Sequence, residues 1–210
     1  DAALSPADRR LAYRLRYRAY RAADGIAPQA SEAVRDWVDD YPNARTYLLR
    51  DGDDVVGTIR SNVYVHGAAG HRLFVADEWP PDALAWLADG DVVVESSRFA
   101  VDPDRSEHQM SYFLGLFRAH YANSHAHGAR YILTAAQRHH ILFYRRRLAF
   151  EVVSEPITIK GLNIAPVAMI RLDYRAHVRT LASRFPEAVV DDAEVERLAV
   201  PTTVGSTTGP

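Results

Sequence analysis

The chain has 210 residues, 48% of them hydrophobic, which suits one folded domain or one domain with an appendage. Its formal net charge of −2 argues against charge-driven binding of nucleic acid or membranes, and the absence of cysteine excludes disulfides and thiolate metal sites. No apolar run approaches the roughly 18 residues of a membrane helix, and no signal-peptide segment starts the chain, so we expect a cytoplasmic enzyme or binding domain.

The first part of the sequence predicts a helix followed by a β-hairpin. Ser5, Pro6 and Asp8 form a capped helix start, and the helix is expected to run to about Ala23 with Leu11 and its helical neighbours on one face. The next elements are a short helix, two strands joined by a tight turn and one helical turn, expected at 32–40, 46–50, 55–65 and 82–88.

The stretch 92–104 is the most informative. It starts as an apolar run, carries Glu95 and Arg98, and stops at Asp102–Pro103, as a buried strand that delivers polar chemistry at its end would. A carboxylate in such a run is costly to bury unless it is paired, hydrogen-bonded or needed as a base.

The rest of the chain predicts an alternation of helices and strands. The elements are a helix from Gln109 toward Gly128, then strand, helix, strand and strand at 131–135, 141–148, 150–154 and 165–173. This order predicts a mixed sheet with helices packed on it. The last residues, VPTTVGSTTGP, form a low-complexity tail that we expect to be loose.

This order resembles the GNAT acyltransferase superfamily, whose late helix-to-strand motif is similar to Phe143–Tyr144 followed by Leu-Ala-Phe-Glu at 148–151. Ala149 stands where that motif usually has Gly, and one extra Arg lengthens the spacing. The resemblance implies an α+β fold, an α/β/α sandwich with a mixed, mostly antiparallel sheet. We expect a single such domain over 1–175, followed by a helical appendage and the tail over 176–210.

A closer resemblance is to the N-acyl amino acid synthases and acyl-homoserine lactone synthases. The four motifs that carry it are Leu-Arg-Tyr-Arg-Ala-Tyr at 15–20, Asp-Trp-Val-Asp-Asp at 36–40, Val-Gly-Thr-Ile-Arg at 56–60 and Glu-Ser-Ser-Arg-Phe at 95–99. The lactone synthases have a Trp soon after the first helix, where this chain has Gly25–Ile26. The family resemblance implies transfer of an acyl group from a thioester to an amine.

That reaction assigns candidate catalytic roles. Glu95 would deprotonate the amine, and the alternative is a structural ion pair with Arg98, which needs a bulge at Ser96–Ser97 to bring the two side chains together. Arg98 would hold the pantetheine arm, or it would pair with an acidic residue near the first helix. Backbone N–H groups from Phe99 to Val101 would bind the oxyanion. Tyr144 would protonate the departing thiolate, with core packing as its alternative.

The other motif residues are candidates for substrate binding. Arg60 is expected to bind a substrate carboxylate, and Asp36 and Asp39 a substrate ammonium group, unless the aspartates belong to an exposed charged turn. Tyr20 lies in the first-helix motif with Arg16. We expect Arg16 to belong to a basic face that is solvated or docks an acidic carrier protein.

The donor is predicted from a missing feature. The superfamily's pyrophosphate loop is rich in glycine, whereas the corresponding stretch 105–111 has none and carries Glu107. The expected donor is therefore an acyl-phosphopantetheine on an acyl carrier protein, with acyl-CoA as the alternative. Arg105, His108 and Ser111 would hold its single phosphate.

We expect no permanently bound cofactor and no metal, because the His pairs at 125/127 and 139/140 lack ligand spacing. The expected function is therefore N-acyl transfer from a carrier protein to an amino acid or related small amine. Three alternatives stay open: a lactone synthase using S-adenosylmethionine, a CoA-dependent N-acetyltransferase, and a GNAT-fold binding module without catalysis.

Overall fold

A six-stranded sheet runs through the molecule in the order β1-β2-β3-β4-β6-β5, in a computed structural model that describes residues 1–201 apart from the side chain at position 106. Only β3 and β4 pair in parallel; every other neighbouring pair is antiparallel. The strands are β1 (Ala44–Asp51), β2 (Asp54–Val65), β3 (Val92–Val101), β4 (Tyr131–Gln137), β5 (Glu151–Val152) and β6 (Val167–Asp173). The mixed, mostly antiparallel sheet flanked by helices confirms the predicted α+β fold.

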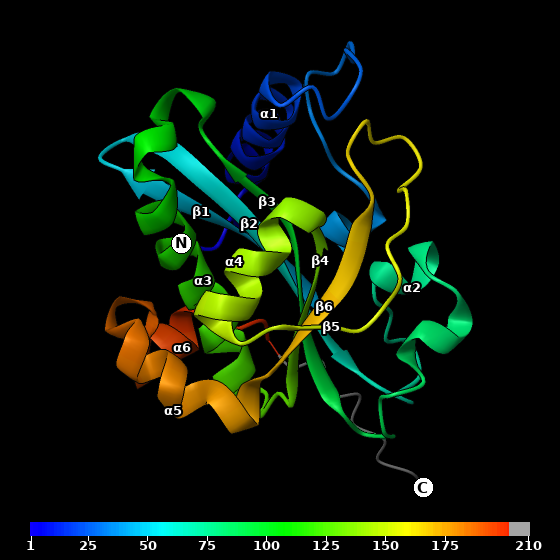
Figure 1. Ribbon diagram of the computed structural model, residues 1–210. Coiled ribbons are helices and arrows are strands. Elements are labelled where there is room, and N and C mark those ends of the chain that lie inside the picture. The colour runs from blue at the N-terminus through cyan, green and yellow to red at the C-terminus, as the bar shows by residue number, and fades with distance from the viewer. Residues whose placement is uncertain (202–210) are drawn as a thin grey trace, which may run out of the picture.

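Helices cover both faces of the sheet (Figure 1). One face carries α1 (Pro6–Ala22), η1 (Trp37–Asp40), α2 (Val75–Glu78) and η2 (Pro81–Leu84). The other face packs against α3 (Gln109–Ala126), α4 (Arg138–Leu148), α5 (Tyr174–Arg184) and α6 (Asp192–Leu198). The short helices η3 (Pro103–His108) and η4 (Pro186–Ala188) lie between these elements. Each face therefore has its own apolar core, as a layered α/β/α arrangement requires.

Local sequence signals explain most of these elements. The Ser5 side chain accepts a hydrogen bond from the Asp8 backbone and caps α1, as predicted. The expected apolar face was wrong at Leu11, which is 42% exposed, because α1 instead buries Ala12, Leu15 and the long side chain of Arg16.

Two predicted helices are placed differently. The helix expected over 32–40 is reduced to the short η1, which Asp36 caps. The helical turn expected at 82–88 lies earlier, as α2 and η2. Neither segment has the sustained 3.6-residue apolar period of a longer helix, so tertiary contacts decide where the backbone coils.

The parallel pairing of β3 with β4 is short. It runs from Val93 opposite Tyr131 to Ser96 opposite Thr134 and then stops, so the two strands separate beyond this point. On its other side β3 pairs with β2 in regular register until the shift between Thr58 and Arg60. The bulge lies at Arg98, whose φ of 55° is left-handed, and not at Ser96–Ser97, where a bulge would have been needed to bring the side chains of Glu95 and Arg98 together. We call the gap beyond Ser96 and Thr134 the β3–β4 seam.

The residues after β6 belong to the core beneath α3. Leu181 of α5, Phe185 and Leu198 of α6 are buried in the same cluster as Phe117. The boundary expected at 175 falls inside α5, and the tail at 202–210 lies outside the described residues. Within residues 1–201, none of the helices combines the length and apolar character that a bilayer crossing requires.

Candidate active site

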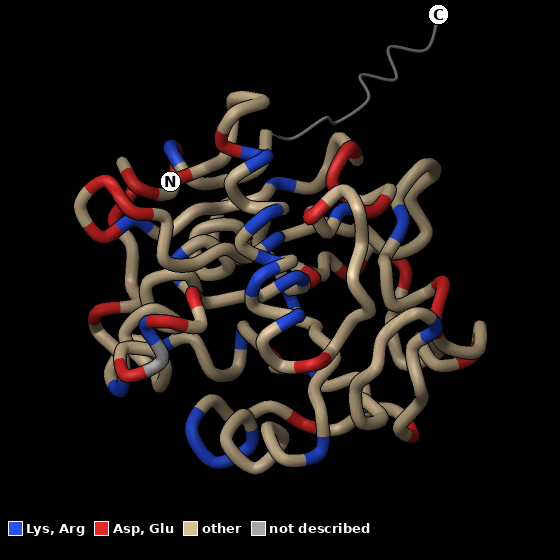
Figure 2. Tube along the Cα trace, turned by 90° about the horizontal axis from the view of Figure 1, so that it is seen from above, with Lys and Arg blue, Asp and Glu red and all other residues tan. Residues whose placement is uncertain are grey.

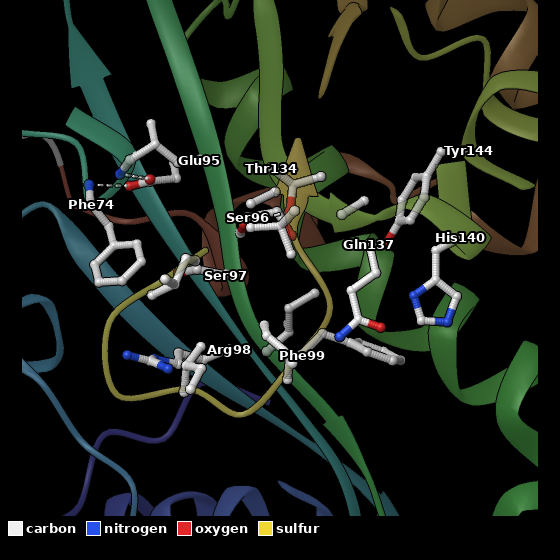
Figure 3. A pocket seen from close by; sticks show the side chains of 18 of the residues that line it. Phe74, Glu95, Ser96, Ser97, Arg98, Phe99, Thr134, Gln137, His140 and Tyr144 are labelled. Carbon is white, nitrogen blue, oxygen red and sulfur yellow. Dashed lines mark hydrogen bonds between the residues drawn. The ribbon is translucent and has the colours of Figure 1, made fainter. Parts of the chain in front are cut away.

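A cavity of about 530 Å³ passes through the sheet at the β3–β4 seam. Its walls come from both faces of the sheet, which is possible because the two strands separate there (Figure 3). On the α1 and α2 face they include Phe74, Val75, Glu95, Ser97, Ile159, Leu162 and Ile164; on the α3 and α4 face they include Phe99, Phe113, Phe117, Ile132, Thr134, Tyr144 and Phe150. Most of this lining is apolar, as a site for an alkyl chain requires.

Glu95 lies in the wall of this cavity and has no solvent exposure. One carboxylate oxygen, Oε2, accepts hydrogen bonds from Asn62 Nδ2 at 3.1 Å and the Phe74 backbone N at 2.9 Å. The other, Oε1, accepts from the Val75 backbone N at 2.9 Å. A carboxylate has about four acceptor positions, so one is left for a ligand.

The environment of Glu95 makes it a stronger base than an exposed carboxylate. Burial raises the pKa of Glu95, and the three hydrogen bonds together with the charge of Arg60 lower it by less. Glu95 forms no ion pair with Arg98, which bonds Asp36 instead, so the alternative of a structural pair between them is contradicted. Its bonds to Phe74 and Val75 also fix the start of α2 against the sheet.

A buried charge network lies beside Glu95. Asp36 Oδ1 accepts from Arg60 Nη1 at 2.6 Å, and Asp36 Oδ2 accepts from Arg98 Nε at 2.8 Å and Arg98 Nη2 at 2.5 Å. Burial pushes the pKa of Asp36 upward, but the two guanidinium groups outweigh it and hold the pKa at about 2. Arg60 also donates to Ser97 Oγ at 3.1 Å, which ties the network to β3.

The second half of the network ties α1 to β1. Arg16 Nη1 bonds both oxygens of Asp39, at 2.8 and 3.0 Å, and Arg16 Nη2 donates to Thr46. Arg60 Nη1 lies 3.1 Å from Asp39 Oδ2 and joins the two halves. The expectation of a solvated Arg16 was wrong, because its side chain has no exposed surface.

Only some of the residues predicted to contact substrate line the cavity. Asp39 and Arg60, which are predicted to bind substrate, have no exposed side-chain surface and do not line the cavity, and the same holds for Arg16. Asp36 and Val101 do not line it either. The predicted residues that the cavity brings together are Tyr20, Glu95, Arg98, Phe99 and Tyr144.

Tyr144 faces the cavity from α4, on the side of the seam opposite Glu95 (Figure 3). Its ring packs on Phe113, Phe143 and Phe150, and burial raises the pKa of Tyr144 to about 12. Gln137, which the sequence did not single out, and His140, which it singled out only as part of a histidine pair without ligand spacing, point toward the same space (Figure 3). Their only sequence signal is their position where a strand runs into a helix.

The loop expected to hold a phosphate has another set of partners. Arg105 pairs with Asp51 at 3.1 Å and Asp54 at 2.6 Å across the β1–β2 turn. His108 and Ser111 line a small hollow with Asp51. The three residues therefore do not converge on one anion site, and a phosphate would have to displace the carboxylates from Arg105.

Two further residues at the site were missed by the sequence prediction. Asn62 and Phe74 contact Glu95, although they come from β2 and from the segment before α2. Asn62 follows Arg60 by two residues, so both point to the Glu95 face, and this spacing was the available signal. Within residues 1–201, no three His, Asp or Glu side chains are grouped to hold a metal ion.

Comparison with known proteins identifies similar chains. The family model for N-acyl amino acid synthase FeeM matches residues 11–173. The structure is similar to that of FeeM, an N-acyl amino acid synthase from uncultured soil microbes, with a TM-score of 0.68 and 23% identity, covering 90% of this chain and 94% of that one. No curated protein matches the chain significantly.

Other solved structures share the fold at lower similarity. A CoA-dependent acyl-homoserine lactone synthase, BjaI, with SAM and isopentyl-CoA, has a TM-score of 0.61 and 18% identity, covering 90% of each chain. A putative N-acetyltransferase from Lactobacillus plantarum has a TM-score of 0.53 and 20% identity, covering 81% of this chain and 94% of that one.

Proposed function

The chain belongs to the N-acyl amino acid synthase FeeM family and is an acyltransferase, and we propose that it moves a fatty acyl group from a carrier-bound thioester to the amine of an amino acid or related small molecule. The observation that carries this proposal is the buried carboxylate of Glu95 in the wall of a mostly apolar cavity that crosses the sheet. One side of the seam offers a base, and the other offers room for an alkyl chain.

On the α1 and α2 face, Glu95 acts as general base toward the amine. An amine is protonated at neutral pH, so a base must remove a proton before the nitrogen attacks the thioester. The raised pKa of Glu95 suits it to that transfer, and the three hydrogen bonds hold its carboxylate in place. Arg98, with 14% of its side chain exposed and a place in the cavity wall, is the cation available to an acceptor's carboxylate.

The seam provides the donors for the oxyanion. Beyond Ser96 the edge of β3 no longer pairs with β4, and the bulge at Arg98 turns the backbone. We assign the oxyanion to backbone N–H groups on that open edge, between Phe99 and Val101. Their position at the junction of the two faces is where the tetrahedral carbon would form.

On the α3 and α4 face, the alkyl chain lies among Phe113, Phe117, Ile132 and Phe150, and Tyr144 donates to the departing thiolate. A thiol has an ordinary pKa of about 8.5, below that of Tyr144. The apolar surroundings that raise the tyrosine's pKa raise a thiol's as well, so the gap between them narrows in the site.

The carrier-bound donor is supported by what the loop before α3 contains. Residues 105–111 have no glycine, and their arginine is already paired with Asp51 and Asp54. Such a loop does not form the wide nest of N–H groups that a pyrophosphate needs. A single phosphate needs fewer donors from this loop. His108 and Ser111 would hold it, together with Arg105 once Arg105 is released from its partners.

The test is an intact-mass screen of products from acyl carrier protein and CoA thioesters of several chain lengths with a panel of amino acids. The expected result is an N-acyl amino acid, formed faster from the carrier thioester. Homoserine lactone products with release of methylthioadenosine would assign the lactone synthase reaction instead. No product from any donor would overturn the proposal.

A further inference from the structure

Tyr144 needs a source of protons if it is to give its own proton to a departing thiolate. Its ring packs on Phe113, Phe143 and Phe150, and burial raises the pKa of Tyr144 to about 12. A tyrosinate left among these rings after the transfer would be a poorly solvated charge. The proton that Tyr144 gives up must therefore be replaced as it leaves.

Few groups on this side of the seam carry a titratable proton. Among the described residues that line the cavity on the α3 and α4 face, only His139, His140 and Tyr144 titrate. Most of the other lining there is apolar, and an acyl chain bound in the cavity displaces water from it. Once the donor is bound, side chains rather than free water must carry the replacement proton.

His140 has the position that this transfer requires. It lies four residues before Tyr144 on α4, so the two side chains lie on the same side of the helix, one turn apart. Both line the cavity, and Figure 3 shows them next to each other at one end of it. His140 is also exposed. One imidazole thus contacts both solvent and the space in front of Tyr144.

The surroundings of His140 favour its neutral form. Burial and, to a smaller extent, the charge of His139, whose ring centroid lies 4.0 Å away, lower the pKa of His140. Acidic and basic residues intermingle along most of the trace (Figure 2), but α4 has no Asp or Glu to oppose this shift. At neutral pH one ring nitrogen is therefore a donor and the other an acceptor.

Both side chains have free hydrogen-bonding groups. Within the described part of the chain, neither the Tyr144 hydroxyl nor a ring nitrogen of His140 makes a hydrogen bond. Exposed side chains change rotamer rapidly, and catalytic hydrogen bonds often tighten only when substrate is bound. A rotation of the His140 ring, or one bridging water, is enough to connect the pair.

We propose that His140 returns a proton to Tyr144 while Tyr144 protonates the departing thiolate, an inference that rests on the proposed function. As the C–S bond breaks, its electron pair goes to sulfur, which takes the proton of Tyr144 Oη. The tyrosine oxygen takes a proton from one ring nitrogen of His140, and the other ring nitrogen takes one from solvent. Both side chains end neutral, while the amine's protons leave through Glu95 on the other side of the seam.

The experiment compares the unaltered chain with His140→Gln, Tyr144→Phe and the double variant. The measurement is the single-turnover rate of amide formation, which slow product release does not mask. With an alkyl thioester, His140→Gln is expected to lose about ten- to hundredfold. Because the two side chains act in series, the double variant is expected to lose no more than Tyr144→Phe alone. The control is His125→Gln, at an exposed histidine on α3 that does not line the cavity.

Two further measurements separate a proton relay from a structural role. A thiophenyl ester of the same acyl chain releases a more acidic thiol, whose thiolate departs without a proton, so the loss in His140→Gln is expected to fall to within about twofold. Added imidazole is expected to restore the rate of His140→Ala, since the shortened side chain leaves room for it beside Tyr144. Thermal unfolding of each variant checks that the fold is kept.

The outcomes separate the relay from the transfer reaction. An unchanged rate in His140→Gln, equal losses with both thioesters, or additive losses in the double variant would overturn the relay while the transfer reaction stands. A loss in His139→Gln as large as that in His140→Gln would overturn the assignment to His140. If the unaltered chain forms no product with any thioester, the proposed function fails, and the relay fails with it.

Discussion

Glu95 holds one end of α2 and also faces the proposed amine, so Glu95→Gln tests its charge while keeping most of its shape. The variant is expected to lose about 10²- to 10⁴-fold in kcat/KM, since the amide cannot accept the amine's proton. One of the backbone N–H groups of Phe74 and Val75 would also lose its charged acceptor, at about 1–3 kcal/mol of stability.

The pH dependence of the activity tests the same residue, because a general base predicts the direction of the change. A base works in its ionised form, so activity of the unaltered enzyme rises with pH through the raised pKa of Glu95. That acid limb is expected to be absent from the residual activity of Glu95→Gln, measured by initial rates across the acidic range. Glu151→Gln, at an exposed carboxylate on β5, is the control. Equal rates and identical profiles would remove Glu95 from the mechanism.

Asp36 links the stability of the fold to pH, and its pKa is lowered where that of Glu95 is raised. Its folded pKa of about 2 lies below the ordinary 3.8, so its stabilisation is complete above that ordinary value and is lost as pH falls toward 2. The full effect is about 2 kcal/mol, of which about half is gone by pH 3. Urea unfolding at a series of pH values should show a shallower acid loss in Asp36→Asn.

The control for that series is Asp40→Asn, because Asp40 pairs with Arg35 on the surface rather than in the network. At neutral pH the Asp36 variant should also be less stable by about 3–5 kcal/mol, since Arg60 and Arg98 lose a buried counter-charge. The same acid slope in both variants would show that Asp36 is not the linked group.

At the scale of elements, α4 ends on a strained residue. Ala149 follows the helix with a φ of 59°, and its backbone N–H bonds the carbonyl of Tyr144. Glycine takes this left-handed conformation without a clash of Cβ. Ala149→Gly is expected to raise the free energy of unfolding by up to about 1 kcal/mol, measured by urea denaturation.

The end of α3 provides the reverse substitution. Gly128 has the same φ of 59°, with open space around the position of a Cβ. Gly128→Ala is therefore expected to lower stability by a comparable amount. A lower stability in Ala149→Gly would mean that the packing of the Ala149 methyl outweighs the backbone strain.

How far the sequence predicts these elements depends on whether their cause is local. The bounds of β3 follow from its apolar run and its terminal Asp-Pro, and α1 follows from its capping residues. α2 was missed because Glu95, about twenty positions away, holds its first N–H groups. The burial of Arg16 was missed for the same reason: its partner Asp39 lies beyond the helix, and the neighbouring arginines suggested a surface.

The family motifs predicted the site better than local spacing did. Glu95, Arg98 and Phe99 come from one motif and Tyr144 from another, and all four line one cavity. What the spacing could not give was the partner of each charge. Arg98 turns to Asp36 because the bulge falls on Arg98 itself, and a bulge one or two residues earlier would have directed it elsewhere.

At the scale of the whole molecule, the cavity volume limits the acyl chain. Ala136 and Ile132, four residues apart on β4, both line the cavity. Ala136→Leu extends a side chain into that space and is expected to shift the products toward shorter chains. Ile132→Val is expected to shift the products toward longer chains and to lower the stability by about 0.5–1.5 kcal/mol. The measurement is the distribution of acyl lengths from a mixed pool of thioesters. An unchanged distribution in both would place the chain outside this cavity.

The passage through the sheet also bears on how the product departs. An amide formed at the seam would keep its polar head among Glu95 and Arg98 and its hydrocarbon tail among the phenylalanines of α3. To leave the site, the product must pass either its polar head or its hydrocarbon tail through the β3–β4 seam. We expect product release to slow as the acyl tail lengthens. For the longest acyl chains, the turnover number would then be limited by product release rather than by formation of the amide bond.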